Sequence, residues 1–129
     1  MPYLARHPAQ SVFLPLRGLR YHLETWGDDV QASAERPLLL CLHGWMDVGA
    51  SFQFMVDALA AREGPQRRIV APDWRGFGRS SPSGSDSYWF PDYVADLDAL
   101  IDTLSPAHPV DLLGHSMGGN VAMSYAGVR

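Results

Sequence analysis

The stretch Leu112-Leu113-Gly114-His115-Ser116-Met117-Gly118-Gly119-Asn120 decides the fold of this chain. It contains the pattern G-x-S-x-G and joins two segments of different periodicity. Residues 110–113 are Val and two Leu around a single Asp, a short β-branched and leucine segment that is typical of a buried parallel strand. The apolar residues after the turn recur at helical spacing: Val121, Ala122, Tyr125 and Ala126. The sequence therefore predicts a strand, a very tight turn and a helix.

Such a turn is a nucleophile elbow, in which the serine has a strained backbone and its hydroxyl projects from the tip. Ser116 is the candidate catalytic nucleophile. Gly114, Gly118 and Gly119 lack a Cβ, so strand and helix can approach each other closely. The backbone N–H of Met117 begins the helix, where negative charge is stabilised. Without further support, the same pattern would also fit an ordinary glycine-rich turn.

The composition is that of an ordinary globular domain, with 129 residues and a net charge of −4. This length is enough for one small domain with its own core. All ten basic residues are Arg, and no basic cluster indicates a nucleic-acid partner. Cys41 is the single cysteine and lies in an apolar run, so we expect a buried thiol and no intrachain disulfide.

The first ten residues contain no apolar segment of the kind found in signal peptides, and no stretch approaches membrane-spanning length. We therefore interpret residues 1–10 as a flexible leader. We also expect no membrane partner and a cytoplasmic location.

Four segments ahead of the elbow are predicted to be strands. Residues 11–16 and 19–26 read as the two arms of a hairpin, with Pro15 restricting the first arm to a sheet edge. Residues 37–42 are a continuous apolar run, and residues 68–71 form another short strand. The intervening segments 27–36 and 72–85 are polar or rich in Gly and Ser and are predicted to be loops.

Two further helices are predicted between these strands. The first begins with Ser51 as N-cap, ends at Glu63-Gly64-Pro65, and buries one face formed by Phe52, Met55, Val56 and Leu59. The second begins near Pro91 and buries Val94, Leu97, Ile101 and Leu104. Its aspartates, Asp92, Asp96, Asp98 and Asp102, are interpreted as a solvated acidic face. We expect no metal there, because no further ligand converges.

The resulting order is a hairpin followed by repeated strand–helix units, which predicts an α/β fold with parallel crossovers. In such sheets, functional groups gather at the carboxyl ends of the strands. Three motifs fall at predicted strand ends: His43-Gly44-Trp45, Asp73-Trp74-Arg75 and the Ser116 turn. Their convergence on one rim supports a functional site more strongly than the elbow does alone.

In the order and spacing of these motifs, the chain resembles the N-terminal part of an α/β-hydrolase-fold serine hydrolase. The matching stretches are residues 42–45, residues 73–80 and residues 114–119. The resemblance implies that residues 11–129 form the N-terminal part of one such domain, with an incomplete sheet that ends after the elbow helix.

The resemblance also implies roles for individual residues. Ser116 would attack the substrate, and the backbone N–H groups of Trp45 and Met117 would stabilise the resulting oxyanion. The His43 ring would support the loop that carries Trp45 and would not be the base. Structural support is likewise expected from the following residues: Gly44, Asp73, Arg75, Gly114, His115 and Gly118. In particular, Asp73 and Arg75 would satisfy backbone groups and each other, and His115 would lie behind the elbow.

In this family the catalytic acid and histidine follow the serine along the chain. Residues 117–129 contain no Asp, Glu or His, so the triad is incomplete and we expect this chain alone to be inactive. Expected partners are a small acyl substrate and either a second copy or the remaining half of the fold. No cofactor and no metal are expected.

Two functional readings stay open. In the first, the intact protein is a serine hydrolase that acts on carboxylic esters or related acyl bonds. Haloalkane dehalogenases and most epoxide hydrolases of this fold carry Asp at the nucleophile position, so Ser116 disfavours them. Carbon–carbon bond hydrolases, amidases, cofactor-free haloperoxidases and perhydrolases keep serine. In the second reading, the chain is a non-catalytic binding module that retains the fold.

Overall fold

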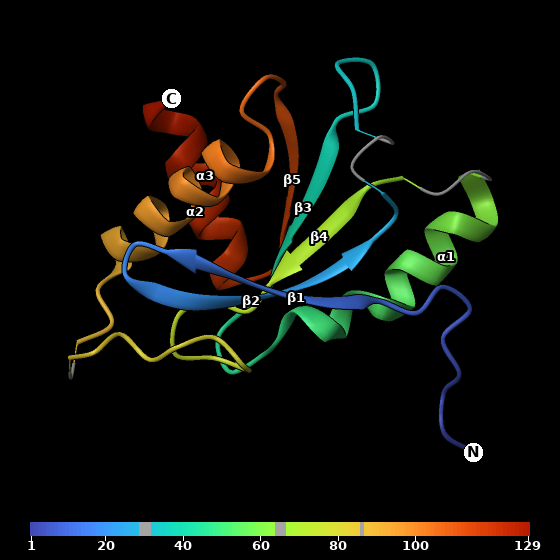
Figure 1. Cartoon of the computed structure of the whole chain (residues 1–129), viewed down its shortest axis with the longest axis horizontal. Helices are drawn as coiled ribbons and strands as arrows, with labels where there is room; N and C mark the ends of the chain where they lie inside the picture. The colour runs from blue at the N-terminus through green and yellow to red at the C-terminus, as the bar shows by residue number, and fades with distance from the viewer. Residues whose placement is uncertain (29–31, 64–66, 86) are drawn as a thin grey trace.

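The computed structural model describes residues 1–28, 32–63, 67–85 and 87–129. Five strands form one sheet with helices on both faces (Figure 1). The strands are β1 (Gln10–Leu16), β2 (Leu19–Trp26), β3 (Leu38–Leu42), β4 (Ile69–Pro72) and β5 (Val110–Gly114). The helices are the 3₁₀ turn η2 (Gly49–Phe52), α1 (Gln53–Glu63), α2 (Phe90–Leu104) and α3 (Met117–Val128).

The strands lie in the order β1-β2-β4-β3-β5. β1 and β2 form an antiparallel hairpin, and β2 continues antiparallel onto β4. β3 pairs in parallel with β4 on one side and with β5 on the other. The predicted α/β fold with an N-terminal hairpin is therefore confirmed. β1 is an edge strand, which explains why Pro15 is tolerated within it.

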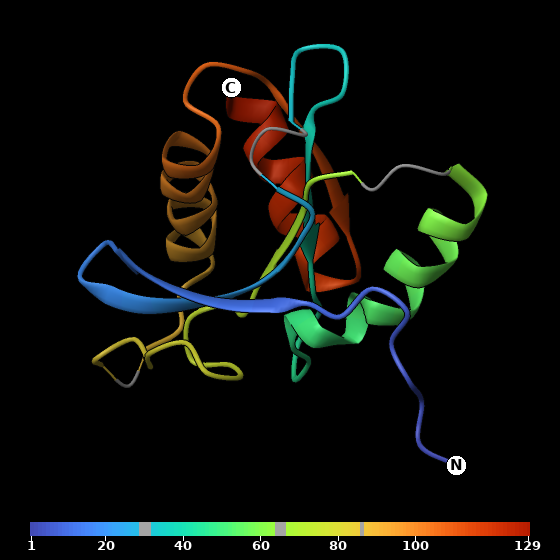
Figure 2. The same cartoon turned by 45° about the vertical axis from the view of Figure 1, so that its right-hand side comes forward.

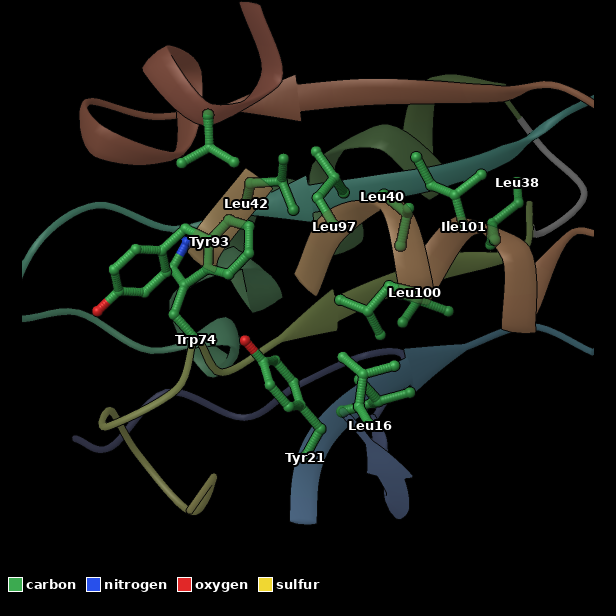
Figure 3. Packing of buried hydrophobic residues seen from close by; sticks show 13 residues of the cluster. Leu16, Tyr21, Leu38, Leu40, Leu42, Trp74, Tyr93, Leu97, Leu100 and Ile101 are labelled. Atoms are coloured by element: carbon green, nitrogen blue, oxygen red, sulfur yellow. The ribbon is translucent and has the colours of Figure 1, made fainter. Parts of the chain in front are cut away.

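The two faces of the sheet are covered by different helices, as Figures 1 and 2 show. α2 and α3 cover one face. Leu97 and Leu100 of α2 join the larger core cluster there (Figure 3), as does Val121 of α3. α1 covers the other face through Val56, with Phe52, Met55 and Leu59 packed against the smaller cluster, as their spacing predicts. All five residues of β3 are buried, because this strand lies inside the sheet and is covered on both faces.

The start of α1 differs from the prediction. Ser51 is not its N-cap, because the 3₁₀ turn η2 precedes the helix, which begins at Gln53. The Ser51 hydroxyl instead donates to the Asp47 carboxylate at 2.5 Å. α1 ends at Glu63 as expected, while Gly64 and Pro65 lie outside the described residues.

α2 begins with Pro91 in its first turn, as expected, but its acidic residues do not form one solvated face. Asp96 is completely buried. Its carboxylate accepts hydrogen bonds from the Tyr21 hydroxyl at 2.6 Å and from Arg75 at 2.7 Å. The interpretation of Asp96 as a solvated residue was wrong, because a partner lies on each of two distant segments. No helix in the described part of the chain has both the length and the apolarity needed to cross a bilayer.

Residues 1–9 contain no helix or strand, and β1 begins at Gln10. The segment nevertheless contacts α1 at a defined point. The Asp57 carboxylate accepts hydrogen bonds from the Tyr3 hydroxyl at 2.5 Å and from the backbone N–H groups of Arg6 and His7 at 3.0 and 2.9 Å. The flexibility expected for residues 1–10 stays a prediction.

Candidate active site

Ser116 occupies the corner between β5 and α3 in an unusual backbone conformation. Its φ of 54° and ψ of −117° lie outside the regions that a serine ordinarily adopts. Backbone hydrogen bonds hold the corner on both sides: His115 donates to the Leu42 carbonyl at 3.0 Å, and Asn120 donates to the Ser116 carbonyl at 3.1 Å. Ser116 itself is exposed. Strain of this kind persists only where the surroundings over-determine it, and here it presents a hydroxyl at the sheet rim.

Two glycines make this corner possible. A Cβ at Gly118 would lie 2.1 Å from the carbonyl oxygen of Leu42, and a Cβ at Gly114 would lie 2.5 Å from Gly119. Neither distance can be accommodated without a backbone shift. The start of α3 can therefore rest against the ends of β3 and β5 only because both positions carry a hydrogen atom.

The two expected oxyanion donors follow neighbouring strand ends. Trp45 lies in the loop after β3, and Met117 begins α3 directly after Ser116. Among the described residues, no hydrogen bond uses the backbone N–H of either residue. The loop also lies against Ser116, because a Cβ at Gly44 would be only 3.1 Å from the Ser116 Cβ. Both N–H groups are thus without a hydrogen-bond partner among the described residues, and both lie at the same rim of the sheet as Ser116.

His43 is buried, and both of its ring nitrogens are occupied. Nε2 accepts the backbone N–H of Trp74 at 2.9 Å, which leaves the proton on Nδ1, and Nδ1 donates to the Gly44 carbonyl at 2.7 Å. Burial lowers the pKa of His43 below its usual value, which favours this neutral form. The ring therefore supports the loop that carries Trp45, and no hydrogen bond described for it reaches Ser116.

Asp73, at the end of β4, also supports this loop. Its carboxylate accepts the backbone N–H groups of Gly49 at 2.8 Å and Arg79 at 3.0 Å. It also lies 2.7 Å from Nδ1 of His22. His22 is a buried β2 residue that the sequence analysis did not single out. Asp73 thus satisfies backbone groups as expected and fixes the start of η2 relative to β4.

Arg75 does not pair with Asp73, which corrects the sequence prediction. Its guanidinium makes two hydrogen bonds of 2.7 Å to Asp96, and its backbone N–H donates to the Tyr21 hydroxyl at 3.0 Å. The Asp96 carboxylate raises the pKa of Arg75, and burial raises that of Tyr21. A signal for Asp96 was present: it lies three residues after Tyr93 and four before Leu100, on the same buried stripe of α2.

His115 was expected to be packed or hydrogen-bonded behind the elbow; the packing is contradicted, and the position behind the elbow stays a prediction. The residue is exposed in the described chain, because β5 pairs only with β3 and its other side carries no strand. Its backbone holds the corner, but no hydrogen bond is described for its ring. The remaining predicted site residues converge on the rim formed by the ends of β3, β4 and β5.

A model of the alpha/beta hydrolase fold family matches residues 37–129, and the chain belongs to that family. Among curated proteins, it is 38% identical over 119 residues to a serine hydrolase-like protein of Danio rerio, covering 91% of this chain and 33% of that protein. It is 36% identical over 114 residues to a 3-hydroxybutyrate-oligomer hydrolase of Cupriavidus necator, covering 88% of this chain and 35% of the relative.

Solved structures of similar architecture include the thioesterase domain from the curacin biosynthetic pathway. It superposes with a TM-score of 0.75 at 36% identity and covers 94% of this chain and 40% of that domain. An epoxide hydrolase from Vigna radiata superposes with a TM-score of 0.74 at 30% identity, covering 91% of this chain and 35% of the enzyme. The chain thus spans about a third of the length of the curated relatives named above.

Proposed function

We propose that Ser116 is the nucleophile of a hydrolase that cleaves carboxylic esters or related acyl bonds. The observation that carries this proposal is the backbone of Ser116, with φ 54° and ψ −117°, at an exposed corner between a parallel strand and a helix. Such a corner presents the hydroxyl to a substrate while the helix N-terminus points at the same place.

In the proposed reaction, the Ser116 Oγ attacks the acyl carbon and the carbonyl oxygen becomes negatively charged. The unoccupied backbone N–H groups of Trp45 and Met117 would hold that oxygen. Each such donor contributes about 3–4 kcal/mol to the stabilisation of the transition state. The alcohol leaves, and water then releases the acid from the acyl-enzyme.

The mechanism requires a general base for the Ser116 proton. None of the hydrogen bonds of the described residues joins a histidine ring to Ser116, and His43 has both nitrogens occupied. In the family, the acid and histidine follow the elbow in sequence. The activity is therefore proposed for the whole protein, in which we expect a catalytic acid and a histidine to complete a triad with Ser116.

The choice of an acyl bond rests on the chemistry of a serine nucleophile. Relatives of the chain are named as a thioesterase domain, a 3-hydroxybutyrate-oligomer hydrolase and epoxide hydrolases. A serine hydroxyl forms an ester intermediate with acyl substrates, which favours the first two classes. The second candidate is a non-catalytic module that keeps the fold, and the lack of a hydrogen bond between any histidine ring and Ser116 in the described residues favours it.

Labelling of the whole protein with a fluorophosphonate tests the proposal. We expect one adduct at Ser116 and its loss in Ser116→Ala. The matched control is Ser124→Ala, which removes an exposed hydroxyl about two turns further along α3 and leaves the elbow intact. If Ser116 stays unlabelled in the folded whole protein, the chain is a binding module.

A further inference from the structure

A second serine, far from the elbow in sequence, lies in a chain of polar contacts. The Ser11 Oγ on β1 is 2.5 Å from Nε2 of His22 on β2. Nδ1 of the same ring is 2.7 Å from the Asp73 carboxylate at the end of β4. The order is thus hydroxyl, imidazole and carboxylate. A nucleophilic serine needs a base within hydrogen-bond reach and a third group that orients the base.

The surroundings fix the orientation of the ring. His22 and Asp73 are both buried, while Ser11 is exposed on the edge strand. The Asp73 carboxylate cannot donate when ionised, so it accepts the Nδ1 proton of His22. Nε2 is then free to accept the proton of Ser11. Backbone N–H groups of Gly49 and Arg79 hold the carboxylate in place.

Two charged side chains stand where charge would develop. The Arg79 guanidinium is 3.3 Å from the Ser11 Oγ, where a positive group would stabilise an oxyanion formed on an attacked carbonyl. The Glu24 carboxylate is 3.7 Å from Nε2 of His22, where it would stabilise the ring once protonated. The Phe13 ring flanks the His22 ring at 4.9 Å and is itself partly exposed.

We propose that Ser11, His22 and Asp73 form a second nucleophilic site, which reacts with small acyl esters that can reach the sheet edge. The Ser11 Oγ forms a bond to the acyl carbon as its proton passes to Nε2 of His22. The ester C–O bond then breaks, and the departing alkoxide takes that proton. Water then attacks the acyl carbon as one of its protons passes to Nε2 of His22. The bond between the acyl carbon and Oγ breaks, and Oγ takes that proton, which releases the acid and restores the serine. The site uses no residue of the elbow.

A purely structural contact is the competing explanation, since a buried histidine requires partners for both nitrogens. The two explanations differ in rate. A structural hydrogen bond leaves Ser11 no more reactive than other exposed serines, whereas general-base assistance accelerates attack by about 10²–10⁴-fold. Ser51 is the matched reference, because it is exposed and its hydroxyl donates to a carboxylate without any imidazole.

The experiment uses the full 129-residue chain with Ser116→Ala, so that the elbow cannot contribute. It is treated with a fluorophosphonate, and adducts at Ser11 and Ser51 are counted by mass spectrometry in the same sample over time. We expect labelling of Ser11 at least tenfold faster than that of Ser51. A ratio below ten overturns the proposal and leaves the proposed role of Ser116 untouched.

A second variant tests the base. His22→Gln retains a polar side chain in the buried site but cannot take a proton, so labelling of Ser11 should fall to the rate of Ser51. Circular dichroism establishes whether this variant folds. If it folds and labels Ser11 at the original rate, the proposal is overturned; if it does not fold, the ratio of Ser11 to Ser51 labelling decides the matter alone.

Discussion

His43 and Trp74 are joined by two hydrogen bonds, and Trp74 is the donor in both. The His43 ring accepts the backbone N–H of Trp74 at 2.9 Å, and the Trp74 indole N–H donates to the His43 carbonyl at 3.0 Å. The first bond joins the Trp74 backbone to the His43 ring, and the second joins the Trp74 ring to the His43 backbone. The loops after β3 and β4 are therefore fixed to each other, and with them the segment that carries Trp45.

This arrangement predicts a loss of stability in mild acid. Because burial lowers the pKa of His43 in the folded state, the unfolded chain binds the proton more readily. The contribution is fully present above the unfolded value of about 6.5 and is lost as the pH falls below it. Urea unfolding at pH 7.5, 6.5 and 5.5 should show a decrease of up to about 1.4 kcal/mol per pH unit from this residue.

His43→Gln should reduce that dependence, whereas His108→Gln, at an exposed position, should leave it unchanged. Equal pH dependence in the parent chain and in His43→Gln would show that the ring does not control acid stability.

Replacing the buried carboxylate of Asp96 should cause a large loss in the free energy of unfolding. Asp96→Asn removes the charged acceptor of two Arg75 hydrogen bonds and leaves that guanidinium with only the more distant Asp92 carboxylate, at 3.9 Å. Breaking a buried pair in this way costs about 3–5 kcal/mol. Asp102→Asn, on the exposed side of the same helix, should change the free energy of unfolding by less than about 0.5 kcal/mol. Similar losses in both variants, measured by chemical denaturation, would argue against the network.

Two adjacent glycines should respond in opposite ways to the same change. Gly118→Ala places a Cβ 2.1 Å from the Leu42 carbonyl oxygen, whereas Gly119→Ala meets its nearest atom at an ordinary 3.4 Å. We expect the first variant to lose at least about 1–3 kcal/mol of stability through overpacking. The second should be neutral or gain up to about 1 kcal/mol of helix propensity. Thermal melts of the pair measure the difference, and a reversed ranking would refute the close approach at the elbow.

The outer edge of β5 should make the chain self-associate. β5 pairs only with β3 among the described strands, and Leu113 is 40% exposed. An uncovered apolar edge is a template for pairing with another strand. Sedimentation velocity should show association that rises with concentration and weakens in Leu113→Lys, since charges protect sheet edges. Met123→Lys, on the exposed surface of α3, is the matched control. A monodisperse monomer at all concentrations would contradict the prediction.

The local parts of this structure could be predicted because the signals are local. The run 37–42 predicts β3, and the helical spacing of the apolar residues along α1 predicts its buried face. The elbow could be predicted for the same reason. The pattern G-x-S-x-G directly after a strand allows the backbone few conformations other than a tight strand-to-helix turn. The position of β4 between β2 and β3 could not, because strand order depends on pairing between distant segments.

The errors at the site have a common physical origin. The sequence suggests Asp73, two residues from Arg75, as its partner, whereas the carboxylate that it binds belongs to Asp96 on α2. His22 was read only as part of a strand, although the fold brings Ser11 and Asp73 to its two nitrogens. In both cases the sequence identifies the polar side chain. It does not identify the partner, because the partner comes from a distant segment that only the tertiary fold brings close.

The central place of β3 has a consequence for synthesis on the ribosome. Leu40 pairs with Val70 on one side and with Leu112 on the other, so both neighbours are translated after it. At about 5–20 residues per second, the second neighbour emerges roughly 4–14 s later. During that interval the nascent chain carries the apolar segment Leu-Leu-Leu-Cys-Leu without its final partners, and segments exposed in this way are prone to aggregate.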